Sequence, residues 1–108
     1  MRQTKRTRRI AEMEAKLDEA RDAVDRFQDA VRDYARIQDT VEELERYYYS
    51  DWRKDYEADE AGKLPPDLKR GVLSEDALYD LLTDNKLAAA DALYTFAQML
   101  GQGQIRTA

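Results

Sequence analysis

Apolar residues recur along the first third of the chain at a regular spacing. They form a stripe of eight positions: Ile10, Met13, Leu17, Ala20, Val24, Phe27, Val31 and Tyr34. Steps that alternate between three and four residues place such side chains on one face of an α-helix, as at the a and d positions of a heptad repeat. No glycine or proline occurs before Gly62. The pattern therefore predicts a long helix from about Arg8 to Ala35.

The spacing changes after Tyr34. The next apolar positions are Ile37, Val41, Leu44 and Tyr48, whereas an unbroken heptad would continue at Gln38. Two successive steps of three either overwind one continuous helix or mark the end of the first helix and the start of a second. We predict a bend or break near Asp39, with another helical segment following it.

The middle of the chain has strong start and stop signals for a short helix. Ser50 is a suitable N-cap residue, and Gly62 is a suitable residue for the position just after a helix. Pro65 and Pro66 block any continuation. Residues 66–70 are predicted to form a single helical turn that stops at Gly71.

Ser74 is predicted to cap the last helix, with Glu75 and Asp76 in the first turn, where the helix dipole favours acids. A wide apolar stripe from Leu78 to Leu100 follows, and Gly101 and Gly103 end it. No segment alternates with the period of a β-strand. The predicted fold is all-α, with the long N-terminal heptad helix packed antiparallel on the C-terminal helix and short helices and a Gly/Pro loop between them.

The predicted organisation is a basic flexible arm over residues 1–8, a single helical domain over 9–101 and a frayed tail over 102–108. The length of 108 residues fits one domain. The stripe from Ile10 to Tyr34 is long enough that the other helices would leave part of it uncovered. We therefore expect the chain to self-associate, most simply as a homodimer.

Composition excludes several kinds of chemistry. The chain contains no cysteine and no histidine, which excludes thiol catalysis, disulfide scaffolds, zinc fingers and Ser-His triads. We expect no cofactor and no metal. No apolar run is long enough to cross a membrane, and no apolar segment follows the basic start as in a secretory signal. The expected location is the cytoplasm.

Charge is unevenly distributed. Residues 1–9 carry a net charge of +5 and residues 10–60 a net charge of −9. The basic arm could contact nucleic-acid phosphates, although a solvated terminus is the simpler interpretation and no nucleic-acid-binding motif accompanies it. The acidic helix could mimic nucleic acid and occupy a basic groove on another protein. Eight bases interleave with its 17 acids, however, which is typical of an ordinary solvated helix.

Two groups of residues stand out as a candidate site between Tyr47 and Asp76. The first is aromatic and consists of Tyr47, Tyr48, Tyr49, Trp52 and Tyr56. It could bind a protein partner, because tyrosine and tryptophan dominate such contacts, or it could form the small core at one end of a helical bundle. Three consecutive tyrosines cannot all point inward on a helix, so at least one should be exposed.

The second group is charged and includes Asp55, Asp59, Lys69, Arg70 and Asp76. It could hold a hard cation or act as an acid/base pair. It could equally be an ion-pair network that fastens the Gly/Pro loop to the short helix, and we favour this structural clip. In that case Lys69 and Arg70 would pair with Asp55, Asp59 or Asp76.

Three sequence segments resemble a family of small bacterial proteins known as a domain of unknown function, numbered 4298. The pattern R-I-x-x-M-E-x-x-L-D matches Arg9, Ile10, Met13, Glu14, Leu17 and Asp18. The pattern Y-Y-x-S-x-x-W-x-x-D-Y matches Tyr47, Tyr48, Ser50, Asp55 and Tyr56, with the tryptophan at Trp52 and Tyr49 in place of a glycine. The pattern D-E-A-G-x-L-P-x-D-L-K-R-G-V-L-S-E-D matches residues 59–76. The resemblance implies a helical fold and a bacterial or phage origin, and it implies no activity.

These observations favour a non-catalytic protein-interaction or adaptor module whose protein partner the sequence does not identify. Two alternatives stay open. One is an inhibitor from a phage or mobile element that acts by acidic mimicry. The other is an enzyme that uses the carboxylate and Lys/Arg cluster on a small substrate.

Overall fold

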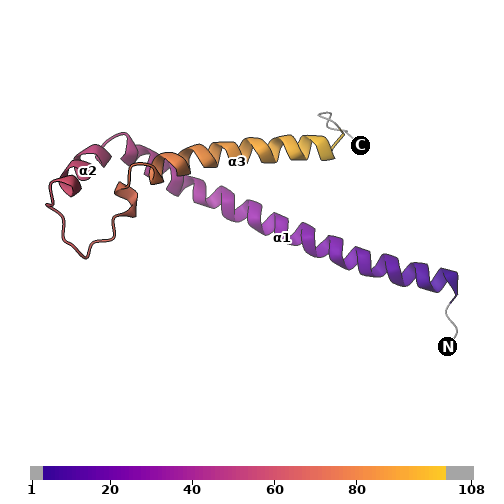
Figure 1. Cartoon of the computed structure of the whole chain (residues 1–108). Coiled ribbons are helices and arrows are strands. Elements are labelled where there is room, and N and C mark those ends of the chain that lie inside the picture. Colours follow the sequence, from indigo (N-terminus) through magenta and orange to yellow (C-terminus); the bar gives the residue numbers. More distant parts are fainter. Residues whose placement is uncertain (1–3, 102–108) are drawn as a thin grey trace. The chain divides into compact units, whose positions relative to one another are not determined.

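The computed structural model describes residues 4–101, and these fold into helices without any β-strand. In chain order they are α1 (Lys5–Tyr48), α2 (Trp52–Glu60), the single 3₁₀ turn η1 (Gly71–Leu73) and α3 (Ala77–Met99) (Figure 1). The prediction of an all-α chain with a long N-terminal helix, a C-terminal helix and short elements between them is confirmed. The predicted frayed tail lies outside the described residues.

Helix α1 is longer than the sequence pattern predicted. It runs without interruption from Lys5 to Tyr48, so a break near Asp39 is wrong, while a bend there stays a prediction. No glycine or proline interrupts this stretch, and the helix accepts the change of apolar spacing because side chains merely rotate to another part of its surface.

The first turn of α1 overlaps the predicted basic arm. The Thr7 backbone N–H donates to the Thr4 Oγ1 at 3.1 Å, and the Thr4 N–H donates to the Thr7 Oγ1 at 2.9 Å. Such a reciprocal pair satisfies two of the N–H groups that a helix start leaves without partners. Residues 5–8 are therefore helical, and residues 1–3 of the predicted arm lie outside the described part.

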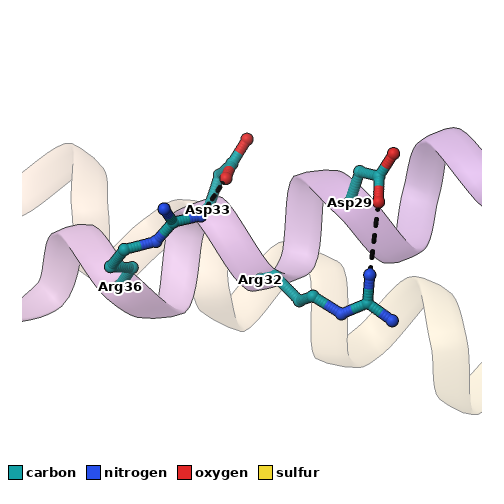
Figure 2. A network of polar contacts seen from close by, with 4 residues as sticks. All are labelled: Asp29, Arg32, Asp33 and Arg36. Atoms are coloured by element: carbon teal, nitrogen blue, oxygen red, sulfur yellow. Dashed lines mark hydrogen bonds and ion pairs between the residues drawn. The ribbon is translucent and has the colours of Figure 1, made fainter.

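The polar face of α1 is held by ion pairs within the helix. Asp22 pairs with Arg26 at 3.3 Å. Figure 2 shows the next two pairs, in which Arg32 contacts Asp29 and Arg36 contacts Asp33. Each links neighbouring turns and is exposed to solvent, so each contributes only a few tenths of a kcal/mol, about 0.2–0.5. Together they favour the helical state of a segment that has no buried residue.

Helix α2 ends as the sequence predicted but starts differently. Gly62 has φ of +68°, its N–H donates to the Asp59 carbonyl, and the Lys63 N–H donates to the Ala58 carbonyl, both at 3.0 Å. This is a Schellman motif, which needs a residue in the left-handed region. The predicted N-cap Ser50 is wrong, because its hydroxyl donates back to the Arg46 carbonyl at 2.7 Å and α2 begins at Trp52.

The helical turn predicted over residues 66–70 is also wrong. A turn closed by the Leu68 N–H and the Pro65 carbonyl occupies this region, and the 3₁₀ turn comes afterwards, at Gly71–Leu73. Gly71 does not have positive φ, so it opens the 3₁₀ turn and does not stop a helix. The Ser74 hydroxyl accepts the Ala77 N–H at 3.3 Å, although α3 itself begins at Ala77 with Asp76 as its N-cap residue.

The chain divides after Asp39 into two units, each with its own internal contacts. The first is the N-terminal part of α1. The second begins at Thr40 and contains α2, η1 and α3, and here η1 contacts both helices. Its core is small and consists of Leu73 on η1 with Leu78 and Leu82 on α3. The single domain predicted over residues 9–101 and the antiparallel packing of the N-terminal on the C-terminal helix stay predictions.

The stripe of the first unit is exposed. Its seven large apolar residues are between 40% and 55% accessible, and Ala20 is exposed as well. In the second unit Tyr49 is 78% accessible, while Tyr47 and Tyr48 are partly buried. This confirms that at least one of the three consecutive tyrosines faces solvent.

Candidate functional site

The candidate site is the segment between Tyr47 and Asp76, which we call the clip. It lies wholly in the second unit. Three aromatic rings at four-residue spacing contact one another in the clip. Tyr48 contacts Trp52 with ring centroids 5.4 Å apart, and Trp52 stacks on Tyr56 at 5.1 Å with planes 19° apart. Tyr49 meets the edge of Tyr48 at 5.2 Å. Such ring pairs contribute about 0.5–1.5 kcal/mol each beyond the area they bury.

Three side-chain hydrogen bonds connect the elements of the clip. The Tyr47 hydroxyl, at the end of α1, donates to Asp55 Oδ2 on α2 at 2.6 Å. The Trp52 indole Nε1 donates to the Val72 carbonyl of η1 at 2.9 Å. The Tyr56 hydroxyl donates to Glu75 Oε1 at 3.0 Å, just before α3. Helix α2 is thus fastened both to the chain before it and to the chain after the Gly/Pro loop.

One ion pair adds to these contacts. Arg70 Nη1 lies 2.8 Å from Asp59 Oδ1, and the two side chains are 33% and 27% accessible. The pairing expected for Arg70 is therefore present, and it ties the end of the loop to the last turn of α2. Lys69 and Asp76 are exposed, and in the described part of the chain neither forms an ion pair.

The electrostatics of the clip act on two phenols. Burial, together with the hydrogen bond to Asp55, raises the pKa of Tyr47 from 10.0 to about 12. The hydrogen bond to Glu75 raises the pKa of Tyr56 as well. In both cases a carboxylate accepts a hydrogen bond from the phenolic O–H, so ionising the phenol would place two negative charges side by side. Both tyrosines hold their protons near neutral pH and serve as hydrogen-bond donors.

A small open cavity lies beside the Tyr47–Asp55 pair. Its volume is about 270 Å³, and it is lined by Tyr47, Asp55, Leu64, Leu68, Lys69, Arg70, Val72 and Leu73. Ligand pockets usually measure about 300–1,000 Å³ and enclose most of the ligand. Three of its polar side chains already form hydrogen bonds: Tyr47 donates to Asp55, and Arg70 donates to Asp59 outside the cavity lining. What this cavity offers a ligand is a shallow apolar depression with one lysine at its edge.

The clip brings together most of the predicted site residues. Those that make side-chain contacts between elements or ring contacts are Tyr47, Tyr48, Tyr49, Trp52, Asp55, Tyr56, Asp59 and Arg70. Sequence reasoning placed Glu75 in the first turn of the last helix and did not foresee its bond to Tyr56. The Val72 carbonyl was missed too, since a backbone acceptor has no signal in the sequence. Within residues 4–101, no three acidic side chains are grouped so that they could hold a metal ion.

Comparisons with known proteins give one family. The model of the family described as a domain of unknown function (DUF4298) matches residues 10–95. The match spans the stripe, the clip and most of α3. Neither a curated protein nor a solved structure matches the chain significantly. None of the helices in the described chain is long and apolar enough to span a membrane.

Proposed function

The chain belongs to the DUF4298 family, whose description names no activity, and we propose that it is a non-catalytic protein-interaction module. The observation that carries this proposal is the stripe on α1. Seven large apolar side chains lie along 25 residues of one helix face, each about half exposed. Contiguous exposed apolar surface of this kind usually marks a surface that binds another protein.

The regular spacing of the stripe narrows the kind of partner. Steps of three and four residues present a seam that another amphipathic helix can fit, with side chains of one helix entering the gaps of the other. An extended peptide or a flat surface would match only part of it. The partner we propose is therefore helical, with apolar residues at the same spacing.

The contacts of the clip support a structural role for it within the second unit. Its carboxylates accept hydrogen bonds from phenols and from an arginine, and the phenols hold their protons firmly because their pKa values are raised. A catalytic pair needs a group that releases or takes up a proton near neutral pH. We therefore assign the clip to holding α2, η1 and α3 together.

The alternative of acidic mimicry needs one continuous acidic face. On α1 the arginines at positions 26, 32 and 36 each pair with an aspartate one turn earlier. Acids and bases therefore alternate on the polar face (Figure 2), and no observation favours mimicry over an ordinary solvated helix.

Affinity capture from cells of the source organism tests the proposal. The bait proteins are the wild type, Val24→Glu in the middle of the stripe, and the matched control Ala15→Glu on the opposite face of the same helix. Both variants add one carboxylate at an exposed helical position, so only the stripe differs. We expect a protein that the wild type and Ala15→Glu retain and that Val24→Glu loses. Equal retention by all three baits would reject the stripe as the binding surface.

A further inference from the structure

We propose that the partner of the stripe is a second copy of this chain, aligned antiparallel, with the two-fold axis crossing the stripe at the level of residue 22. The inference rests on the proposed function, because it names the partner of the same surface. It concerns only the first unit, where the stripe lies on one uninterrupted helix.

The stripe is complementary to itself in this arrangement. In an antiparallel pair centred at residue 22, residues whose numbers add to 44 lie opposite each other. All eight positions then find an apolar partner, in four kinds of layer that run from Ile10 opposite Tyr34 at the ends to Ala20 opposite Val24 beside the axis, and each kind occurs twice in the dimer. Every layer combines an a position with a d position, as antiparallel helix pairs require.

Side-chain size also favours this alignment. In a parallel pair each residue would meet its own copy, so Ala20 would face Ala20 and leave a gap, while Phe27 would face Phe27 and crowd the next layer. In the antiparallel pair Phe27 lies opposite Leu17, and Ala20 lies opposite the larger Val24. The layers become more equal in volume, which lets both helices approach along their whole length.

The charges at the two ends of the stripe also favour the antiparallel orientation over the parallel one. Before the stripe, residues 5–9 carry four bases and no acid. After it, residues 39–45 carry four acids and no base. A parallel pair would place the four bases of each copy beside those of the other, and likewise the acids. In an antiparallel pair centred at residue 22, the four bases of one copy no longer lie beside those of the other, and Lys5 of one helix lies opposite Asp39, the first acid of this segment, on the other.

Helix α3 of the same chain is a poorer match for the stripe. Its residues Leu78 and Leu82 are already buried in the core of the second unit. The other apolar residues of α3 keep the spacing of three and four only from Ala89 to Leu100. This span is about half as long as the 25 residues of the stripe. Matching the stripe over its full length takes a helix of equal length and spacing, and a second copy provides one.

The first test measures assembly of the purified chain. Sedimentation equilibrium should show a dimer for the wild type and for Ala15→Glu. Val24→Glu should dissociate at least about 100-fold more readily, because each dimer would gain two unpaired charges near its centre. A wild type that is monomeric at high micromolar concentration would overturn the inference. Binding of another protein to the stripe of such a monomer would leave the proposed function standing, so the two failures are distinguishable.

The second test fixes the orientation. The chain has no cysteine, so the double variant Met13→Cys, Val31→Cys forms only disulfides that involve these positions. Within one helix they are 18 residues, about 27 Å, apart and cannot join. An antiparallel dimer gives disulfides between position 13 of one copy and position 31 of the other, whereas a parallel dimer joins 13 to 13 and 31 to 31. Tryptic cleavage after Lys16 and Arg26 separates the two sites for mass spectrometry, and homodisulfides as the main product would overturn the antiparallel pair.

Discussion

Replacing Trp52 by alanine tests whether the clip holds the second unit together. The indole stacks on Tyr56, contacts Tyr48 and donates to the Val72 carbonyl. Two ring pairs at about 0.5–1.5 kcal/mol each and one hydrogen bond of about 1 kcal/mol give a loss of roughly 3 kcal/mol. Trp52→Phe keeps a ring and loses the hydrogen bond, so it should cost about 1–2 kcal/mol. Arg70→Ala removes a partly exposed ion pair and should cost about 1 kcal/mol.

Native-state hydrogen exchange is the suitable assay, because α1 would dominate a measurement of total helix content. The Leu73 and Leu82 amides lie in the small core, so their protection reports the free energy of opening of the second unit. We expect the order of loss Trp52→Ala, then Trp52→Phe, then Arg70→Ala. A Trp52→Ala variant with protection within about 0.5 kcal/mol of the wild type, or a larger loss from Arg70→Ala, would refute the structural clip.

Three further predictions use the same unit. Because the pKa of Tyr47 is raised from 10.0 to about 12, the folded state holds this proton more tightly than the unfolded state does. Its contribution to stability is complete below pH 10 and is lost as the pH rises from 10 to 12; thermal midpoints measured against pH should show this fall, and Tyr47→Phe should flatten it. Gly62→Ala should lower the free energy of unfolding measured in urea by about 1 kcal/mol, because φ is +68° at this residue although space for a Cβ is free. Gly71→Ala should leave that free energy unchanged or raise it slightly, because Gly71 also has space for a Cβ and does not have positive φ. Equal effects of the two substitutions would contradict the Schellman assignment. Deleting residues 1–8 should leave the exchange protection of Leu82 unchanged, because it removes only the capped first turn of α1; a clear loss would mean that this end contacts the second unit.

The sequence predicted those parts of the fold that depend on local rules. The spacing of the stripe predicts a helix because apolar periodicity and the absence of glycine and proline act together on every residue from Ile10 to Tyr34. Gly62 predicts the end of α2 because few other residues adopt positive φ without strain. Both features are decided by neighbours within a turn or two, and both are present.

The failed predictions share another cause. The change of spacing after Tyr34 was interpreted as a break, yet a helix without buried residues has no core to keep its apolar face in one direction, so it continues to Tyr48. Ser50 and Gly71 fit their predicted roles by residue type alone. Their actual positions depend on contacts over longer distances, such as Trp52 with Val72, which set where α2 begins and where the loop turns into η1.

The sequence predicted which residues make up the candidate site better than it predicted which of them contact one another. Aromatic and charged residues gather between Tyr47 and Asp76, and that clustering is visible in the sequence. Which carboxylate each donor reaches depends on how the Gly/Pro loop returns along α2. Asp59 was one of three candidates for Arg70, whereas Glu75 as the acceptor of Tyr56 follows only from the three-dimensional arrangement.

The small core of the second unit explains why polar contacts matter so much in it. Leu73, Leu78 and Leu82 are its buried residues in the described chain, and so few buried side chains contribute little against the entropy lost on ordering. Hydrogen bonds and stacked rings of the clip must supply much of the remainder. The clip therefore keeps the second unit folded by contacts that lie within that unit.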